Sequence, residues 1–533
     1  MQLPTSLPAH LERYASGYWG NRTLGDCARD WANKCPDEIV FLDDPAQPTY
    51  ANLLSDGEAL ALALFDLGLR PGEVMSFQTP NWVEAATINL AAALGGFVIN
   101  PIVHIYRDAE VQQMLGDCAA KVFFVAESFR SIDYAAMVDR IQPSLPALEQ
   151  VIYVRAAERT PSFTSLVEHG RKLTHALPKV DPDAVKLLLY TSGTTGRPKA
   201  VLHSHNTLAR VAEVTARHNG IIGQDITLMP SPVTHISGYS GGLEKPFQVG
   251  SRTVLMEVWD AARAVELIDR YHVTSTVAAT PFLVELYRAA KEAGSALPSF
   301  QRFACGGAAV PAELVRTANN ALSVPCAYRV YGSSEVPLAT QGYMPHYDPD
   351  RAAETDGQAI DYELRVVDDN GADLPTGADG EILARGPAMF MGYADEAQTA
   401  EAITDDGYFC TGDIGHLRPD GGLVITGRKK DLIIRGGENI SAKEIEDVLH
   451  THPAVREAAV VSMPHMRLGE GICAFIIAAE ETEADLLASH VHASGLARQK
   501  CPERFEFVAD LPRTASGKVR KDILRAKIRE ELA

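Results

Sequence analysis

The chain has 533 residues, of which 46% are hydrophobic and 22% are charged, and its formal net charge at pH 7 is −20. This length predicts roughly three or four compact units, and the composition is typical of an ordered globular protein with large cores. The acidity argues against nucleic acid and anionic membranes as partners, because both bind to basic surfaces.

The beginning of the chain and its cysteines favour a reduced, cytoplasmic protein. The opening residues, MQLPTSLPAHLERY, lack the basic region and apolar core of a signal peptide. The most apolar long stretch, 85–103, contains Asn, Gly and Pro, so it predicts a buried helix followed by a strand and not a membrane span. The eight cysteines form no CxxC or Cys/His cluster, which suggests neither a zinc site nor a disulfide framework.

Helical periodicity alternates with short β-branched runs through most of the chain. This alternation predicts the α/β fold class, with helices and strands in layered α/β units. In chain order, the predicted elements are helix 50–67, strand 74–79, helix 82–94, strand 122–125, strand 187–190, helix 261–271, strand 275–278, helix 281–293 and strand 303–304.

The pattern of predicted secondary structure changes from about residue 360 onward. Short strands and Gly-rich turns, such as GEILARG and GGLVITG, predict a small β subdomain. A break near 427–430 divides the chain into predicted domains 1–427 and 428–533, and the second is long enough for a small α+β domain. The elements predicted in it are helix 442–450, strands 458–462 and 472–478, helix 483–498 and a basic helix 518–532.

The stretch LLLYTSGTTGRPKAVLHSHN, residues 187–206, carries the clearest chemical signal. A predicted buried strand runs into the turn 191–199, which has hydroxyl side chains, two glycines and two cations. Such a turn can surround a polyphosphate with backbone N–H groups. It is not the common NTPase phosphate loop, because Lys199 is followed by Ala200 where that loop has a Ser or Thr for the metal.

This turn resembles the phosphate-binding signature of the acyl-adenylate-forming (AMP-binding) superfamily, YTSGTTGxPKGV, with Ala200 in place of the final Gly. The resemblance covers essentially the whole chain and implies a large N-terminal domain followed by a small, mobile C-terminal domain. Further motifs follow in the order of that family: PVTHISG (232–238), YGSSE (331–335), GEILARGPAMFMGY (380–393), YFCTGDIG (408–415), GRKKDLIIRGGENISAKEIE (427–446) and LPRTASGKVRK (511–521).

The resemblance implies a reaction in two steps. A carboxylic acid would react with ATP to give an acyl adenylate and pyrophosphate, and the acyl group would then pass to CoA, so that ATP, Mg²⁺ and CoA are the expected cofactors and substrates. No general base is needed, because a carboxylate is already ionised near neutral pH. By resemblance, the catalytic roles fall on Thr191, His235, Glu335 and Lys518.

The same resemblance assigns the nucleotide site residue by residue. The turn 191–199 would wrap the β- and γ-phosphates, and Tyr331 would pack on the adenine. Asp413 and Arg428 would contact the ribose, while Glu335 and Thr194 would hold Mg²⁺, a hard cation that prefers oxygen ligands. The implied ATP- and AMP-binding set is Thr191, Ser192, Gly193, Thr194, Thr195, Gly196, Lys199, Gly306, Gly307, Ala308, Tyr331, Gly332, Ser333, Ser334, Asp413 and Arg428.

Two lysines of the C-terminal part also receive roles from the resemblance. Lys518, in an SGK loop, would bridge the attacking carboxylate and the α-phosphate, and Lys430 would be the hinge about which the small domain rotates. Such a rotation lets one site serve two half-reactions. After it, the segment 435–441 would approach the acceptor, where Gly436 and Gly437 leave room for a pantetheine arm. Without the resemblance, Lys518 would be interpreted as a solvated charge at the start of a basic helix, and the segment 435–441 as a simple tight turn.

The resemblance also implies an acid pocket that is apolar to weakly polar. No Asp near His235 is available to pair with a substrate amine, which argues against a free amino acid. We therefore expect a hydrophobic acid without a fixed charge. The sequences of segments 100–111 and 436–449 resemble those of ligases for cyclohexanecarboxylate and related alicyclic or aryl acids. The implied pocket residues are His235, Ile236, Ser237, Gly238 and Tyr239, with Gly332 behind them.

The acceptor stays open between two classes. CoA is common in this branch of the family, but the residues show no site for its nucleotide phosphates, and Gly471 stands where a bulkier, often basic, residue is expected. The alternative is an amide-bond-forming ligase that passes the adenylate, for example of a polyketide-type ring acid such as coronafacic acid, to an amino acid or amine.

A non-catalytic nucleotide-binding protein is a further alternative, and the intact acidic and basic site residues disfavour it. Because two-fold symmetric dimers are the commonest oligomers of soluble proteins, we expect a homodimer.

Overall fold

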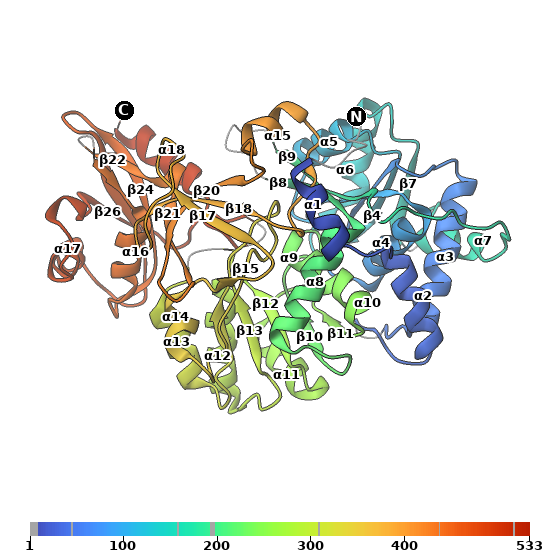
Figure 1. Ribbon diagram of the computed structural model, residues 1–533, viewed down its shortest axis with the longest axis horizontal. Coiled ribbons are helices and arrows are strands. Elements are labelled where there is room, and N and C mark those ends of the chain that lie inside the picture. The colour runs from blue at the N-terminus through green and yellow to red at the C-terminus, as the bar shows by residue number, and fades with distance from the viewer. Residues whose placement is uncertain are drawn as a thin grey trace.

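Two large sheets form the body of the N-terminal part of the chain (Figure 1). The computed structural model describes residues 9–43, 46–156, 159–191, 198–307, 310–435, 438–514 and 517–532. One sheet has seven strands in the order β19-β9-β8-β3-β2-β4-β7, and its strands β8, β3, β2, β4 and β7 run parallel. The other has six strands, all parallel, in the order β1-β11-β10-β12-β13-β14.

The strands of both sheets are short and mostly buried. They therefore appear in the sequence as apolar runs, which is typical of parallel strands that helices cover. The seven-stranded sheet consists of β2 (Val74–Gln78), β3 (Val98–Pro101), β4 (Val122–Ala126), β7 (Gln150–Val154), β8 (Val185–Thr191), β9 (Lys199–Ser204) and β19 (Gly392–Tyr393). The six-stranded sheet consists of β1 (Phe41–Leu42), β10 (Ile226–Met229), β11 (Arg252–Leu255), β12 (Ser275–Ala278), β13 (Arg302–Cys305) and β14 (Ala327–Arg329).

Helices pack against these sheets and bury their apolar residues. The stretch 85–103 illustrates this, because it folds as the buried helix α4, a left-handed cap at Gly96 (φ +71°) and the buried strand β3. The helices of the N-terminal part are α1 (Ala9–Tyr18), α2 (Leu24–Lys34), α3 (Tyr50–Asp66), α4 (Val83–Gly95), α5 (Asp108–Asp117), α6 (Tyr134–Ile141), α7 (Phe163–Gly170), α8 (His205–Asn219), α9 (Ile236–Gly238), the π-helical η2 (Tyr239–Glu244), α10 (Lys245–Val249), α11 (Ala261–Tyr271), α12 (Thr280–Ala293), α13 (Ala312–Ala321), α14 (Pro349–Glu354) and α15 (Glu396–Ala402).

A four-stranded antiparallel sheet confirms the small β subdomain expected after residue 360. It lies between the two large sheets and the C-terminal elements (Figure 1). Its strands are β17 (Glu363–Val367), β18 (Gly380–Arg385), β20 (Phe409–Leu417) and β21 (Leu423–Arg428). Two further strand pairs are β5 (Ser128–Phe129) with β6 (Ile132–Asp133), and β15 (Thr340–Gln341) with β16 (Gln358–Ala359).

The C-terminal domain is a sheet with helices on both faces. Because side chains alternate along a strand, Val460 packs in one core with α16 and α17, whereas Val461 packs in another core with α18. The alternation repeats along the next strand, where Ala474 and Phe475 fall in these two cores. The elements are β22 (Ile433–Arg435), β23 (Glu438–Ile440), α16 (Ala442–His450), β24 (Val455–His465), β25 (Gly469–Ala478), α17 (Ala484–Ala493), β26 (Arg504–Phe507) and α18 (Lys521–Leu532).

The predicted elements of the N-terminal part agree with the structure within two residues at each end, whereas β24 and β25 extend up to three residues beyond the predicted strands. Two helices of the C-terminal domain are shorter than predicted. The helix predicted over 483–498 ends at Ala493, and Gly495 follows with φ +86°, outside helical geometry. The helix predicted over 518–532 begins only at Lys521, because Lys518 belongs to a turn in which Thr514 N–H donates to the carbonyl of Lys518 at 2.7 Å. The overall α/β class, with a large N-terminal domain and a small C-terminal domain, is confirmed.

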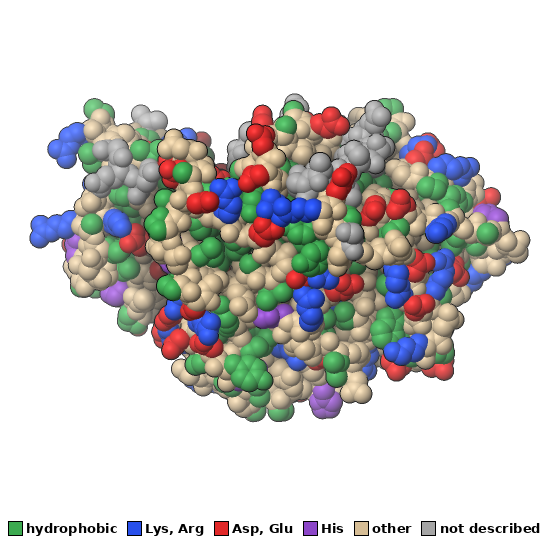
Figure 2. Space-filling view, in the orientation of Figure 1, with side chains coloured by type: hydrophobic (Ala, Val, Ile, Leu, Met, Phe, Trp, Pro, Cys, Tyr) green, Lys and Arg blue, Asp and Glu red, His purple; other side chains and the backbone are tan. Residues whose placement is uncertain are grey.

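Acidic and basic side chains are interspersed over the face of the molecule in Figure 2. The excess of acidic residues therefore does not form one continuous acidic area on this face. Within the ranges that the structure describes, no helix is both long enough and apolar enough to span a bilayer.

Candidate active site

Tyr331, Asp413 and Arg428 form one hydrogen-bonded group. The Tyr331 hydroxyl donates to Asp413 Oδ2 at 2.8 Å, and Arg428 Nε donates to Asp413 Oδ1 at 2.7 Å. Asp413 on β20 and Arg428 on β21 are register partners, so the sheet itself brings this pair together. Burial, together with the neighbouring Asp413 carboxylate, raises the pKa of Tyr331, which keeps its hydroxyl protonated as a donor.

The YGSSE loop orients the carboxylate of Glu335. Ser333 Oγ donates to Glu335 Oε2 at 2.8 Å, and the Tyr393 hydroxyl donates to Glu335 Oε1 at 2.9 Å. His203 also anchors the loop, because its Nε2 lies 2.7 Å from the carbonyl oxygen of Ser334. Burial lowers the pKa of His203 to about 4, so the ring is neutral at pH 7 and donates through Nε2.

Strands β8 and β9 hold the two ends of the phosphate turn. Thr191 and Lys199 are register partners, and Thr191 Oγ1 lies 3.5 Å from the carbonyl oxygen of Lys199. The Lys199 ammonium lies over the ring of Tyr393, 4.8 Å from its centroid. Among the predicted site residues, those outside the described ranges are Ser192, Gly193, Thr194, Thr195, Gly196, Ala308, Gly436 and Gly437.

Lys518 reaches the N-terminal domain from the C-terminal loop. A Cβ placed on Gly307 would lie 3.9 Å from Lys518 Cε, and one on Gly517 would lie 3.8 Å from Ala279 Cβ. Gly306 and Gly307 follow β13 directly, so the lysine lies at the carboxyl end of a strand of the six-stranded sheet. Burial, followed by the charge of Arg428, lowers the pKa of Lys518 to about 8.

The PVTHISG motif turns sharply into a short helix. His235 Nδ1 accepts a hydrogen bond from Ser237 N–H at 3.4 Å and so caps α9, which contains Ile236. A Cβ on Gly238 would lie 2.1 Å from the carbonyl oxygen of Pro232, so this position requires glycine. Burial, with a smaller contribution from the charge of Lys518, lowers the pKa of His235 to about 4. The imidazole is therefore neutral at pH 7, and it interacts electrostatically with Lys518.

Tyr239, another predicted residue of the acid pocket, belongs to a buried polar network. Its hydroxyl donates to Asn89 Oδ1 at 2.5 Å, and Asn89 Nδ2 donates to Glu244 Oε1 at 2.9 Å. Lys186 on β8 makes an ion pair with the same Glu244 oxygen, and both charged side chains are wholly inaccessible to solvent. The network thus joins η2, which carries Tyr239 and Glu244, to the strand that ends at Thr191.

The predicted hinge, Lys430, lies in the short helix η3 (Lys429–Asp431) directly after β21. Burial and the charge of Arg428 lower the pKa of Lys430. Asp431 accepts a hydrogen bond from Arg525 Nη1 of α18 at 3.0 Å. The segment after β21 is therefore attached to the C-terminal domain.

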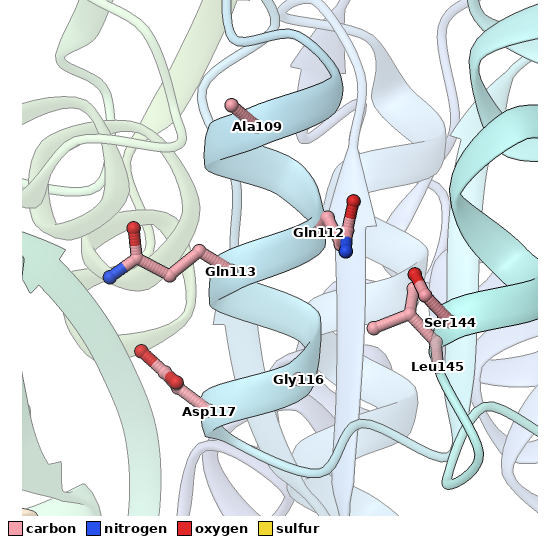
Figure 3. A pocket seen from close by; sticks show the side chains of 7 residues that line it. All are labelled: Ala109, Gln112, Gln113, Gly116, Asp117, Ser144 and Leu145. Atoms are coloured by element: carbon pink, nitrogen blue, oxygen red, sulfur yellow. The ribbon is translucent and has the colours of Figure 1, made fainter.

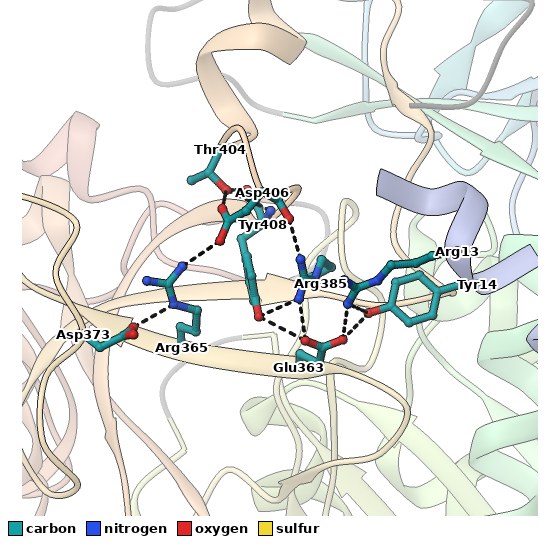
Figure 4. A network of polar contacts seen from close by, with 9 residues as sticks. All are labelled: Arg13, Tyr14, Glu363, Arg365, Asp373, Arg385, Thr404, Asp406 and Tyr408. Atoms are coloured by element: carbon teal, nitrogen blue, oxygen red, sulfur yellow. Dashed lines mark hydrogen bonds and ion pairs between the residues drawn. The ribbon is translucent and has the colours of Figure 1, made fainter. Parts of the chain in front are cut away.

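A network of polar contacts that was not predicted from the sequence joins helix α1 to the four-stranded sheet (Figure 4). The Tyr14 hydroxyl on α1 donates to Glu363 Oε1 at 2.5 Å, and Arg385 and the Tyr408 hydroxyl donate to Glu363 Oε2 at 2.6 and 3.1 Å. Burial tends to raise the pKa of Glu363, but these hydrogen bonds outweigh it and lower the pKa to about 2. The network supports the sheet that carries Asp413 without contributing to the candidate site.

A surface groove of about 460 Å³ lies between α5 and the turn after α6 (Figure 3). Its walls carry Gln112, Gln113 and Asp117 from the helix and Ser144 and Leu145 from the turn. None of the predicted site residues that the structure describes lines it. The groove is therefore separate from the cluster that contains Lys518, Glu335 and Asp413.

The comparison with protein families covers most of the chain. The AMP-binding enzyme family matches residues 28–394, and the AMP-binding enzyme C-terminal domain matches residues 444–518. The chain therefore belongs to the AMP-binding enzyme family, as its motifs indicated. Glu335 lies within the first match, and Lys518 is the last residue of the second.

Several curated proteins are similar to almost the whole chain. The medium-chain fatty-acid–CoA ligase of Escherichia coli is 33% identical over 532 residues, which cover 97% of this chain and 92% of that protein. The indoleacetate–CoA ligase of Aromatoleum aromaticum is 33% identical over 482 residues, covering 90% and 92%. The 2,3-dihydroxybenzoate-AMP ligase of Bacillus subtilis is 32% identical over 527 residues, covering 97% and 96%.

Solved structures share the architecture. The anthranilate CoA ligase AuaEII, in complex with anthranoyl-AMP, superposes with a TM-score of 0.87 at 24% identity, covering 96% of this chain and 98% of that one, which shows likeness of fold alone. The amide bond synthetase McbA of Marinactinospora thermotolerans superposes with a TM-score of 0.83 at 25% identity, covering 95% and 99%. Related folds thus include ligases for different acceptors.

Proposed function

We propose that the chain activates a carboxylic acid with ATP as an acyl adenylate and then transfers the acyl group to CoA as a thioester. The observation that carries the proposal is the approach of Lys518, from the C-terminal domain, to Gly307 and to the charges of Asp413 and Glu335. CoA ligases and AMP ligases that are similar over 90% or more of the chain support the same two-step reaction.

In the first step, a carboxylate oxygen of the acid attacks the α-phosphorus of ATP. The bond between the α-phosphorus and the bridging oxygen breaks, and pyrophosphate leaves with the electron pair. Negative charge accumulates on the α-phosphoryl oxygens, and the attacking carboxylate is itself an anion. The ammonium of Lys518 neutralises both, and its partial burial strengthens this effect because fewer water molecules screen it.

The nucleotide is held by the group around Asp413. We assign Tyr331 to the adenine and Asp413 to the ribose hydroxyls, since a carboxylate offers further lone pairs beyond the two bonds that it already accepts. Arg428 fixes the carboxylate and contacts the ribose from the edge of β21. The turn from Thr191 to Lys199 is assigned to the β- and γ-phosphates, with Lys199 as its cation.

The chemistry around Glu335 fits a bound Mg²⁺. Its carboxylate is a hard oxygen donor, and hydrogen bonds from Ser333 and Tyr393 fix its orientation while leaving further lone pairs on both oxygens. Mg²⁺ in proteins is commonly held by one or two carboxylates together with substrate phosphates. We assign Glu335 and Thr194 to this ion, which when bound neutralises charge on the pyrophosphate leaving group.

For the acid, we propose a hydrophobic alicyclic or aryl carboxylic acid without a fixed charge. The neutral state of His235 and the apolar side chain of Ile236 support an uncharged pocket, in which buried ring surface stabilises the complex by about 25 cal/mol per Å². The relatives named for medium-chain fatty acids, indoleacetate and 2,3-dihydroxybenzoate act on acids whose non-carboxylate part is aliphatic or aromatic.

The second step requires a different arrangement of the C-terminal domain. We propose that the chain divides into domains 1–427 and 428–533 and that the second rotates about Lys430. Rotation withdraws Lys518 and brings the segment with Gly436 and Gly437 toward the adenylate. The CoA thiolate then attacks the acyl carbon and AMP leaves, so that one pocket serves both steps.

An amine acceptor is the second candidate. The likeness to the amide bond synthetase McbA supports it, since the same architecture there belongs to an amide bond synthetase. In that case the amine nitrogen attacks the acyl carbon, AMP leaves, and the nitrogen loses a proton. Every residue assigned to adenylation keeps its role.

The experiment combines an acid panel with an acceptor panel. The protein is incubated with ATP, Mg²⁺ and cyclohexanecarboxylate, benzoate, acetate or palmitate, each with CoA, with an amino acid mixture, or with neither, and the products are weighed by mass spectrometry. We expect a thioester from the ring acids with CoA. An amide without CoA would establish the second candidate, and a preference for palmitate would refute the proposed acid class.

A further inference from the structure

Tyr393 contacts two oppositely charged residues of the candidate phosphate and metal site. Its hydroxyl donates to Glu335 Oε1 at 2.9 Å, and its ring lies 4.8 Å from the ammonium of Lys199. The sequence motif that ends at Tyr393 gave this residue no role in binding. Its side chain is only 3% exposed, so these contacts occur where water competes little with them.

The backbone around Tyr393 is fixed by both neighbouring elements. On β19, Tyr393 is the register partner of Val201 on β9, the strand that begins at Lys199. Nearby, Phe390 N–H donates to the carbonyl oxygen of Glu335 at 2.7 Å. The segment 390–393 is therefore hydrogen-bonded to the Glu335 loop at one end and to the Lys199 strand at the other, which leaves the Tyr393 ring little freedom to move.

The chemistry of a phenol suits this position. An ammonium and a carboxylate that face each other directly attract and tend to pair, which would use up both charges. The Tyr393 hydroxyl satisfies one lone pair of Glu335 without neutralising it, and the ring face attracts the Lys199 cation without removing its charge. Both charges then remain available to a ligand that carries phosphate oxygens and a cation.

We propose that Tyr393 is a positioning residue that orients Glu335 for Mg²⁺ and Lys199 for the phosphates of ATP. This inference rests on the proposed function, because it assumes that Mg²⁺ and ATP bind there. The hydroxyl acts on the metal through Glu335, and the ring acts on the phosphates through Lys199. The two effects are separable, since Tyr393→Phe removes only the first and Tyr393→Leu removes both.

Equilibrium binding of ATP, measured by calorimetry with Mg²⁺ and separately with EDTA, tests the inference without any turnover. For Tyr393→Phe, we expect the Kd of ATP with Mg²⁺ to rise roughly 10- to 100-fold, as for other residues that orient a metal ligand, while the Kd in EDTA stays unchanged. Ser333→Ala removes the donor to the other Glu335 oxygen and should likewise raise the Kd of ATP with Mg²⁺, but Ser333 is itself assigned to the nucleotide, so only Tyr393→Phe is expected to act specifically on the Mg²⁺-dependent binding. Tyr393→Leu should weaken ATP binding in both conditions.

Tyr408→Phe is the matched control. Tyr408 is also a buried tyrosine that donates to a glutamate, Glu363, but it belongs to the network of Figure 4, and its side chain makes no polar contact with any described residue that is assigned to ATP. Its ATP binding should equal that of the wild type with and without Mg²⁺. Thermal unfolding of all variants reports whether each one is folded.

The outcomes separate this inference from the proposed function. Wild-type protein that binds no ATP would overturn the proposed function, and the inference with it. Wild-type binding that does not depend on Mg²⁺ would overturn the metal assignment of Glu335, and hence the inference, while leaving adenylation possible. Wild-type binding that depends on Mg²⁺, together with an unchanged Tyr393→Phe variant, would overturn the inference alone.

Discussion

The side chain of Lys518 lies against Gly307, although the two residues belong to different domains. A Cβ on Gly307 would be 3.9 Å from Lys518 Cε, and Gly307 has φ +80°, a conformation that L side chains rarely adopt. Because glycine has no side chain at this position, the Lys518 side chain lies directly against the backbone of the loop after β13. This is the domain arrangement that the proposed adenylation step requires.

Lys518→Ala should impair adenylation while leaving ATP binding nearly intact. Loss of one charge that stabilises the transferring phosphoryl group typically lowers kcat by roughly 10²- to 10³-fold. The nucleotide contacts at Tyr331 and Asp413 lie outside the C-terminal loop, so the Kd of ATP should change by less than about threefold. Calorimetry gives the Kd, and single-turnover pyrophosphate release gives the rate, with Arg529→Ala on the exposed side of α18 as the control.

The pH profile of adenylation should fall on the alkaline side because of Lys518. Its pKa is lowered to about 8, so the free enzyme loses this positive charge as the pH rises through 8. The kcat/KM for adenylation should then fall tenfold for each further pH unit. Lys518→Arg keeps a permanent charge and should lose the alkaline limb, even if its rate at pH 7 is lower. An unchanged alkaline limb in the arginine variant would assign the titration to another group.

Lys430→Pro should separate the two half-reactions. Proline fixes φ at residue 430 and restricts the residue before it, so the dihedral change needed for rotation becomes unfavourable. We expect adenylation within about threefold of wild type and at least a tenfold slower transfer to the acceptor. Lys429→Ala, a change at the neighbouring residue that leaves the backbone free, should affect neither step. Equal losses in both steps of the proline variant would reject the hinge assignment.

The buried pair of Lys186 and Glu244 should respond differently to single and double substitution. Lys186→Met leaves the Glu244 carboxylate buried without its cation, which typically costs about 3–5 kcal/mol. Adding Glu244→Gln removes the charge but keeps an oxygen for Asn89, so most of the lost stability should return. The midpoint of denaturant-induced unfolding measures both effects. A double variant as unstable as the single one would show that the ion pair is not the source of the loss.

Local periodicity and ordered motifs determine part of the fold and of the candidate site, and these parts could be predicted from the sequence. Helix α11 and strand β12 have the bounds predicted from periodicity, because each is a short amphipathic or apolar segment with clear ends. The ordered motifs assigned Tyr331 and Asp413, which are far apart in sequence, to one site, and in the structure a hydrogen bond joins the two side chains.

Contacts between segments without a shared motif could not be predicted in this way. The partnership of Lys186 with Glu244 depends on the packing of β8 against the π-helical segment η2, and no local periodicity encodes such a pairing. The contact of Tyr393 with Glu335 likewise depends on how β19 pairs with β9. Long-range contacts of this kind are set by the whole fold.

The most direct test of the account is acid-dependent exchange of labelled pyrophosphate into ATP. This exchange requires reversible formation of an acyl adenylate and needs no acceptor. With cyclohexanecarboxylate or benzoate, we predict exchange by the wild-type protein that depends on the acid and is lost in Lys518→Ala. Cleavage of ATP that proceeds equally without any acid, or exchange that persists in Lys518→Ala, would contradict the account.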